Sequence, residues 1–198
     1  MQNDNSKLKI INQDGLDFDP ESFKLKANGY KVVANIPYNI TSLIIRKFLE
    51  AENKPSAMVL LVQKEVAQRI VARAGEMSLL SVSVQFFAEP EIVSIVKNTS
   101  FFPTPKIDSA IIKIKIKNQK LKIKIKERDF FRIVKFGFAS RRKTLENNLV
   151  AGLHIDKTQA SDIIKKAGLP EKIRAQELTV EEWIKIARKV LWQKIRRN

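Results

Sequence analysis

The chain has 198 residues, 44% of them hydrophobic, and carries a formal net charge of +16. This apolar content suffices for a hydrophobic core in one large domain or two small ones, and no apolar run reaches membrane-spanning length. The absence of cysteine excludes disulfides and thiolate metal sites, and the single histidine, His154, cannot build a His-rich zinc site. The first residues lack the basic-then-apolar layout of a signal peptide, so we expect a soluble, cytoplasmic protein without a metal or a membrane partner.

The first part of the chain alternates strand and helix patterns. Apolar runs at 7–14, 30–36 and 57–63 predict strands, and the last two are apolar enough to be buried in a parallel sheet. Helical spacing of apolar residues at 41–50 and 64–75 predicts two helices, the second stopping at its final glycine. Strands that alternate with helices in this way are typical of an α/β fold with a parallel sheet.

The pattern changes between residues 79 and 126. Residues 79–87 fit either a helix or a strand, because periodicity does not separate the two in a short apolar run. Residues 88–97 are predicted to be extended. Residues 108–126 hold two alternating runs around a polar centre at 117–120. They predict an antiparallel hairpin with isoleucines on one face and lysines on the other.

The remaining residues predict a helical region. Apolar residues recur at helical spacing in 127–139, 156–168 and 179–195. The last two segments open with capping-box pairs, Asp156 with Gln159 and Thr179 with Glu182. Their aromatic and aliphatic stripes are expected to form a core rather than a ligand platform. The boundary between the two regions is predicted near residues 118–128.

Positive charge is concentrated in the second half of the chain. Residues 1–108 hold 13 Lys/Arg and 12 Asp/Glu, a net of +1, whereas residues 109–198 hold 24 and 9, a net of +15. Because phosphate groups favour a field of that sign, the second half is predicted to face nucleic acid. An alternative is a lysine-rich surface that only aids solubility, but such a bias should raise both halves.

The sequence Asn35-Ile36-Pro37-Tyr38 places an amide, a proline and an aromatic ring together at a predicted strand end. Proline holds Ile36 extended, so the Ile36 carbonyl has no local helical partner and lies beside the Asn35 side-chain carbonyl. Two fixed acceptors suit an exocyclic amino group, and Tyr38 can stack on the ring that bears it. The nitrogen lone pair is then aimed for in-line attack on an electrophilic carbon, such as a sulfonium methyl.

An ordinary structural turn is the alternative interpretation of this string. Asn-x-Pro-aromatic arises by chance in a small fraction of chains of this length. Its position at a strand end, where α/β proteins bind ligands, favours the functional interpretation. The turn by itself leaves both interpretations open.

Five segments in order extend the pattern over nearly the whole chain: "VVANIPYNITS", "LLVQKEVAQRIVA", "FFPTPKIDSAIIKI", "FASRRKTLENNL" and "IRAQELTVEEW". Together they closely resemble the small-subunit ribosomal RNA adenine dimethyltransferases of the KsgA type. The erythromycin-resistance rRNA methylases are similar around the Asn-Ile-Pro-Tyr turn. The segment "SRRKTLENNL" and the basic helical region favour the first family.

This resemblance implies a fold and an activity. The expected fold is α/β, with a partial Rossmann-like methyltransferase domain over 1–126 and a small, basic, all-helical rRNA-binding domain over 127–198. The expected reaction transfers two methyl groups from S-adenosylmethionine to each of two adjacent adenines near the 3′ end of small-subunit rRNA. The implied partner is the small ribosomal subunit during its assembly.

The resemblance also assigns site residues by position. Residues 35–38 become the catalytic turn, and Asn35 is also expected at the cofactor. Asp14, followed by Gly15, is similar to the family's acid that contacts the cofactor adenine.

Substrate contacts are implied in two further segments. Phe101 and Pro103 match the family's aromatic segment near the adenine that leaves its stack. Arg141, Arg142 and Lys143 are expected to contact rRNA phosphates. The alternatives are a core aromatic at Phe101 and a solvated helix start at the basic triplet.

One departure from the family is large. Its members begin with a glycine-rich strand–turn–helix that holds the methionine end of the cofactor, whereas the six glycines here are scattered singly. We therefore expect an N-terminally truncated or split member, whose first strands could be supplied in trans. The other hypothesis is a non-catalytic RNA-binding or ribosome-assembly factor derived from this family.

Overall fold

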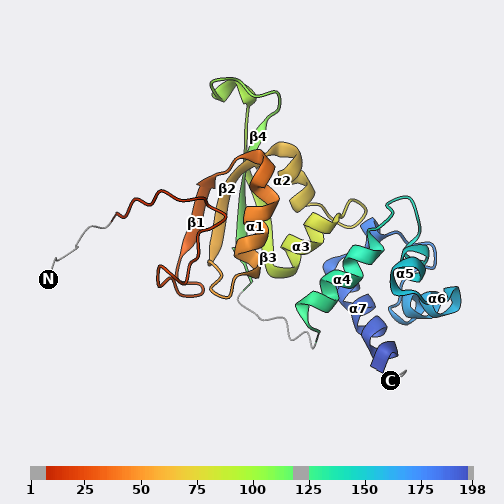
Figure 1. Ribbon diagram of the computed structural model, residues 1–198. Helices are drawn as coiled ribbons and strands as arrows, with labels where there is room; N and C mark the ends of the chain where they lie inside the picture. The colour runs from red at the N-terminus through yellow and green to blue at the C-terminus, as the bar shows by residue number, and fades with distance from the viewer. Residues whose placement is uncertain (1–7, 118–124, 196–198) are drawn as a thin grey trace.

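The computed structural model describes residues 8–117 and 125–195, which form a sheet with helices on one face, followed by a helical region (Figure 1). The described sheet has four strands in the order β1 (Lys31–Asn35), β2 (Ala57–Gln63), β4 (Ser109–Ile116) and β3 (Ala88–Val96). β1 and β2 are parallel, and β4 runs antiparallel to both of its neighbours. The prediction of an α/β fold that ends in helices is confirmed.

The strand register brings several chain segments to one end of the sheet. Gln63 at the end of β2 and Val96 at the end of β3 both pair with Ser109, the first residue of β4. Asn35, the last residue of β1, pairs with Leu61 in β2. The segments that follow β1, β2 and β3 therefore leave the sheet at the same end, which is the end where β4 begins.

Three helices cover one face of the sheet, as Figure 1 shows. They are α1 (Thr41–Glu50), α2 (Lys64–Ile70) and α3 (Leu79–Phe87). Ile45, Leu49 and Ile70 of these helices pack with β-strand residues such as Leu60 and Ile112 in one buried cluster. On the opposite face Val33 is 79% exposed, so the described sheet is covered on one side only.

The helical region has its own core. Its helices are α4 (Glu127–Gly137), α5 (Leu145–Leu153), α6 (Lys157–Lys166), the short η3 (Ala175–Glu177) and α7 (Val180–Ile195). Trp183, Phe130 and Leu145 are fully buried at its centre. The predicted capping boxes of α6 and α7 both form: the Gln159 N–H donates to Asp156, and the Glu182 N–H donates to Thr179. Local sequence signals thus set the starts of these helices.

Helix α3 joins the two regions. Its Val84 lies in the core under the sheet, whereas Val82 and Phe86 lie in the core of the helical region. The rings of Phe86 and Phe130 stack with centroids 4.4 Å apart. Phe131 meets Phe86 and Phe87 at 5.2 and 5.7 Å. The two regions are therefore connected by packed aromatic rings as well as by the chain.

Several strand and helix predictions need correction. Residues 8–14 form no strand, and Ile10 is 87% exposed, because the run finds no neighbour among the described strands. The strand at 30–36 is observed as β1, but it is an edge strand with alternating exposure rather than a buried one. The helix predicted over 64–75 ends at Ile70, and Gly75 lies beyond it in a turn with φ of +103°.

The hairpin predicted over 108–126 is also revised. Its first arm is β4, with Ile112 and Ile114 buried and Lys113 and Lys115 exposed as expected. β4 pairs with β2 on one side and β3 on the other, so both of its edges are occupied. Residues 118–124, which hold most of the predicted turn and of the second arm, lie outside the described residues.

Candidate active site

The Asn35–Tyr38 turn follows β1 directly and is anchored by one buried side chain. Ile36 is 5% exposed and belongs to the core under the sheet. Pro37 has φ of −53° and ψ of 132°, and Tyr38 begins the short helix η1 (Tyr38–Ile40), which leads into α1. The proline thus ends the strand, and the buried isoleucine fixes where the turn lies.

Some hydrogen-bond acceptors of this turn have a partner within the protein, and others have none. The Pro37 carbonyl accepts from the Ile40 N–H at 3.1 Å and from the Thr41 hydroxyl at 3.5 Å. Within the described residues, neither the Ile36 carbonyl nor the exposed Asn35 side chain has a hydrogen-bond partner. Two neighbouring acceptors therefore remain available to an incoming donor.

The Tyr38 ring is held by a residue distant in sequence. Its hydroxyl lies 2.8 Å from the hydroxyl of Ser109, which is fully buried at the start of β4. Sequence reasoning missed Ser109, since the contact spans 71 residues. The available signal was a small polar residue at the start of an otherwise apolar strand.

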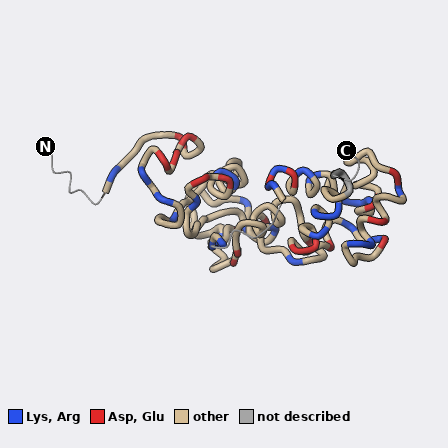
Figure 2. Tube along the Cα trace, turned by 90° about the horizontal axis from the view of Figure 1, so that it is seen from below, with Lys and Arg blue, Asp and Glu red and all other residues tan. Residues whose placement is uncertain are grey.

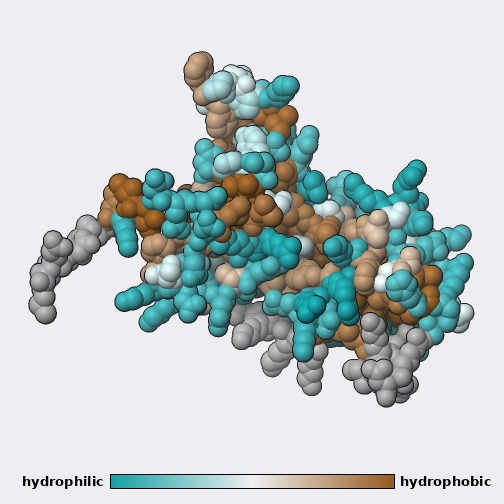
Figure 3. Space-filling model, in the orientation of Figure 1, coloured by the Kyte–Doolittle hydropathy of each residue, from teal (hydrophilic) through white to brown (hydrophobic). Residues whose placement is uncertain are grey.

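A loop between β3 and β4 rises from the same end of the sheet (Figure 1). It begins with η2 (Asn98–Ser100) and is closed by the Asn98 N–H, which donates to Asp108 Oδ1 at 3.1 Å. Phe101 is half-buried, whereas Phe102 is fully exposed beside Pro103. Figure 3 shows this part of the chain as a projection above the rest of the surface. The structure thus places Phe101 and Pro103 on the sheet end that carries the turn.

Asp14 and Gly15 lie in a turn that is tied to α1. Asp14 Oδ1 accepts from the Leu16 N–H at 2.8 Å, and the Lys47 ammonium donates to the Leu16 carbonyl at 2.6 Å. A Cβ on Gly15 would lie 3.7 Å from the Ile44 side chain. This segment therefore runs beside the helix that follows Tyr38, although no strand precedes it as predicted.

Arg141, Arg142 and Lys143 lie in an exposed turn between α4 and α5, well away from the sheet end in Figure 1. Below them Asn148 is 2% exposed, and its amide donates to the Gly137 and Ser140 carbonyls at 2.7 and 2.9 Å. This amide fixes the backbone that leads into the basic turn. Figure 2 shows further Lys and Arg positions distributed along the helical region.

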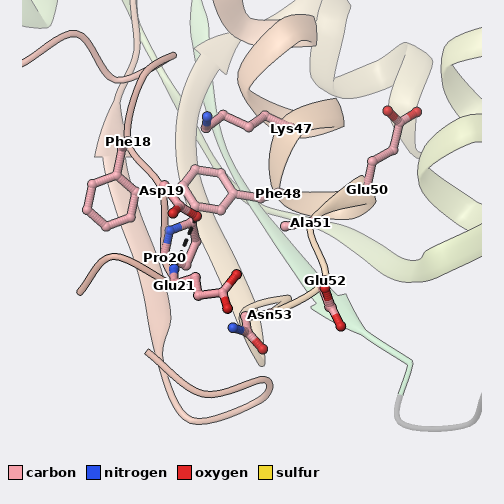
Figure 4. Close-up of a pocket in the computed structure, with 10 residues that line it drawn as sticks. All are labelled: Phe18, Asp19, Pro20, Glu21, Lys47, Phe48, Glu50, Ala51, Glu52 and Asn53. Atoms are coloured by element: carbon pink, nitrogen blue, oxygen red, sulfur yellow. Dashed lines mark hydrogen bonds between the residues drawn. The ribbon is translucent and has the colours of Figure 1, made fainter. Parts of the chain in front are cut away.

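Two cavities lie apart from these residues. One, of about 310 Å³, is lined by Phe18, Asp19, Lys47, Phe48 and neighbours at the far end of α1 (Figure 4). The nearby Tyr30 donates to the Asn53 carbonyl at 2.6 Å, and burial, with the charge of Asp19, raises the pKa of its hydroxyl. The other cavity, of about 530 Å³, lies between the α2–α3 turn, the start of β3 and the start of α7.

The described residues lack two kinds of feature. They contain no cluster of three or more His, Asp or Glu side chains placed to hold a metal ion. Their helices include none that is both long and apolar enough to cross a membrane.

Solved structures share this fold. A dimethyladenosine transferase from Plasmodium falciparum superposes with a TM-score of 0.73 at 25% identity, over 83% of this chain and 68% of that one. The 23S rRNA methyltransferase ErmE superposes with a TM-score of 0.68 at 23% identity, over 90% of this chain and 70% of that one. The second likeness concerns the fold alone.

Sequence comparison gives closer relatives. The ribosomal RNA small subunit methyltransferase A of Dehalococcoides mccartyi (strain CBDB1) is 45% identical over 179 residues, covering 90% of this chain and 62% of the relative. The protein of that name from Desulfitobacterium hafniense (strain DSM 10664 / DCB-2) is 38% identical over 93% of this chain and 66% of its own length. The chain thus spans less than two thirds of these relatives. The family profile described as ribosomal RNA adenine dimethylase matches residues 1–190, and the chain belongs to that family.

Proposed function

We propose that this chain acts in the S-adenosylmethionine-dependent dimethylation of rRNA adenines. Its targets are two adjacent adenines near the 3′ end of small-subunit rRNA, methylated in the cytoplasm during ribosome assembly. One observation carries the proposal: among the described residues the Ile36 carbonyl and the Asn35 side chain, which are consecutive in the chain, have no hydrogen-bond partner, and the hydroxyl of the nearby Tyr38 is anchored by Ser109.

The turn is suited to hold an adenine amino group. An adenine turned out of its stack donates its two N6 hydrogens to Asn35 Oδ1 and the Ile36 carbonyl, while Tyr38 stacks on the base. The nitrogen lone pair then points along a single line. The proton becomes acidic once the nitrogen is positive, so the site needs no strong base. The rate gain comes from position and electrostatics.

The cofactor assignment fits at its adenine end. S-adenosylmethionine, when bound, supplies an electrophilic methyl group. Asp14 Oδ2 has no hydrogen-bond partner among the described residues, so this carboxylate oxygen can accept from the adenine amine of the cofactor. Gly15 and Asn35 complete the proposed set on this chain. The six glycines of this chain are scattered singly, so they form no glycine-rich turn that could hold the methionine end of the cofactor.

Affinity for the RNA is assigned to the basic half. Residues 109–198 carry a net charge of +15, and the Arg141–Lys143 turn is exposed and held by Asn148. Phosphate contacts from this turn would fix the RNA while Phe101 and Pro103 border the target base. We propose the division at 126/127, with methyl transfer in the first part and rRNA binding in the second.

Labelled methyl transfer to undermethylated small subunits tests the proposal. The assay compares the 198-residue chain with the same chain extended at its N-terminus by a glycine-rich strand–turn–helix segment of the kind expected at the start of the family's members. Label in rRNA adenines, lost in Asn35→Ala, is the expected result for at least the extended form. If both forms bind rRNA and neither transfers label, the chain is the non-catalytic assembly factor instead.

A further inference from the structure

Phe102 is the most exposed large apolar side chain of the described residues, at 101% relative exposure. Its ring contacts no aromatic partner in the described structure. Single exposed apolar side chains are common on protein surfaces, so the exposure of Phe102 becomes informative only together with the order of its loop and the charge around it. The candidate-site assignments, which concern Phe101 and Pro103, leave this ring without a role.

The loop that carries Phe102 is held in shape. Asn98 ties its two ends, donating from its backbone to Asp108 and from its side chain to the Pro105 carbonyl at 3.2 Å. The Thr104 hydroxyl donates to the Phe101 carbonyl at 3.3 Å. Prolines at 103 and 105 fix two further φ angles. The ring is thus presented by an ordered loop, which lowers the entropy lost on binding.

The backbone angles of Phe101 and the exposure of both residues indicate that the Phe101 and Phe102 rings face different directions. Phe101 is extended, with φ of −123° and ψ of 151°, and successive side chains on extended backbone point to opposite sides. The burial agrees, because Phe101 is half-buried and Phe102 is open. A single base cannot stack on both rings, so Phe102 would need a ligand of its own.

The charge around the ring favours a polyanion. Lys97 and Lys106 are exposed at the two ends of the loop, and residues 97–107 contain no acidic side chain. The next acid, Asp108, is occupied by the Asn98 N–H and lies 3.6 Å from the Lys64 ammonium. An aromatic side chain on a loop that also carries lysines combines the two features with which proteins bind single strands, a stacking surface and positive charge for the backbone.

We propose that Phe102 stacks on a second unpaired purine of the RNA, separate from the adenine that Tyr38 and Phe101 receive. Lys97 and Lys106 contact the phosphates on either side of it. This inference rests on the proposed function, and it adds a contact to the single-stranded part of the substrate. Stacking is tolerant of base identity, so the site does not require a particular sequence. A purine is the expected occupant because its two fused rings offer the phenyl ring the larger face.

Fluorescence binding with the full chain tests the stacking contact. The probe is an RNA hairpin with a purine-rich single-stranded loop that carries 2-aminopurine at one loop position at a time. The variants are Phe102→Ala, Phe102→Leu and Phe102→Trp, compared with Phe101→Ala. Ile10→Ala is the matched control, because Ile10 is 87% exposed but lies outside the loop. Thermal unfolding verifies that each variant folds.

Phe102→Ala is expected to weaken binding about tenfold and to abolish quenching at one label position. Phe101→Ala should abolish quenching at a different position. Phe102→Leu should behave as alanine does, and Phe102→Trp should restore both affinity and quenching. Unchanged binding in Phe102→Ala would overturn the proposal, as would full rescue by leucine, which would indicate simple apolar contact. If the wild-type chain fails to bind the hairpin, the stacking proposal is overturned, whereas the methyl-transfer assay on small subunits decides the proposed function separately.

Discussion

The sheet end and the helical region expose opposite kinds of polar atoms. At the sheet end the unused atoms are neutral acceptors, the Asn35 amide and the Ile36 carbonyl, in a half of the chain whose net charge is close to zero. On the helical region the exposed atoms of the Arg141–Lys143 turn are cations. Neutral acceptors position a base, whereas cations attract any phosphate chain. Under the proposed function, methyl transfer and rRNA affinity therefore belong to separate surfaces of the molecule.

The largest effect is expected when the side-chain acceptor of the Asn35–Tyr38 turn is removed. Asn35→Ala should reduce methyl transfer by about 10²–10³-fold, because a positioned electrostatic contact is lost, and leave RNA affinity unchanged. Initial rates of label incorporation and filter binding of small-subunit rRNA measure the two quantities. A parallel loss of rRNA affinity would show that the turn contributes to binding and that the surfaces are not separate.

The converse change removes the cations and leaves the turn intact. Replacing Arg141, Arg142 and Lys143 together by Gln should lower the slope of log affinity against log salt by roughly 2–3, about one per lost phosphate contact. The matched control replaces the exposed Lys9, Lys26 and Lys31 of the sheet region by Gln, with the same loss of three charges. Equal slopes in the two triple variants would contradict a specific role for the basic turn.

The two regions also differ in how tightly side chains pack around a glycine, and this difference should affect the free energy of unfolding. A Cβ on Gly137 would lie 2.2 Å from Trp183 Cη2, inside the helical core, so Gly137→Ala should cost about 1–3 kcal/mol of unfolding free energy. Gly15→Ala is the control, since its nearest neighbour would be 3.7 Å away. Urea unfolding curves measure both. A Gly15→Ala loss as large as that of Gly137→Ala would contradict the packing argument.

The smallest expected effect concerns the support of Tyr38. Ser109→Ala removes the partner of the Tyr38 hydroxyl and should cost about 1 kcal/mol of unfolding free energy. Tyr38→Phe removes the same hydrogen bond from the other side, so the double variant should cost less than the sum of the single ones. Urea unfolding of all three variants completes the cycle. Strict additivity would show that the two hydroxyls do not interact.

Local signals were predictable from the sequence. Asp156 with Gln159 and Thr179 with Glu182 define helix starts through contacts three residues apart, and both pairs form as expected. The ambiguous segment 79–87 is a helix for the same reason, because Ser78 and Ser81 form a capping box whose serine pair was overlooked. Pro37 likewise ends β1 by a local steric rule.

Non-local pairing was not predictable in the same way. The run at 8–14 alternates well enough for a strand, but strand formation depends on a neighbour that the sequence does not reveal. The alternating pattern predicts that β4 pairs with the segment that follows it in the chain. In the structure β4 pairs with β2 and β3, which both precede it in the chain. Ser109 and Asn148 act on the candidate site through folded contacts, and no short motif marks them as positioning residues.

Helix α3 has a mechanical consequence for target choice. Its phenylalanines pack against Phe130 and Phe131, and these contacts oppose movement of the helical region relative to the sheet. Tightly packed rings do not slide continuously past one another. Under the proposed function, the protein would bind an RNA productively when the distance between its contacted phosphates and its unpaired adenine matches the distance between the basic turn and the Asn35–Tyr38 turn. The choice of target adenine would then depend on the three-dimensional structure of the RNA as well as on its sequence.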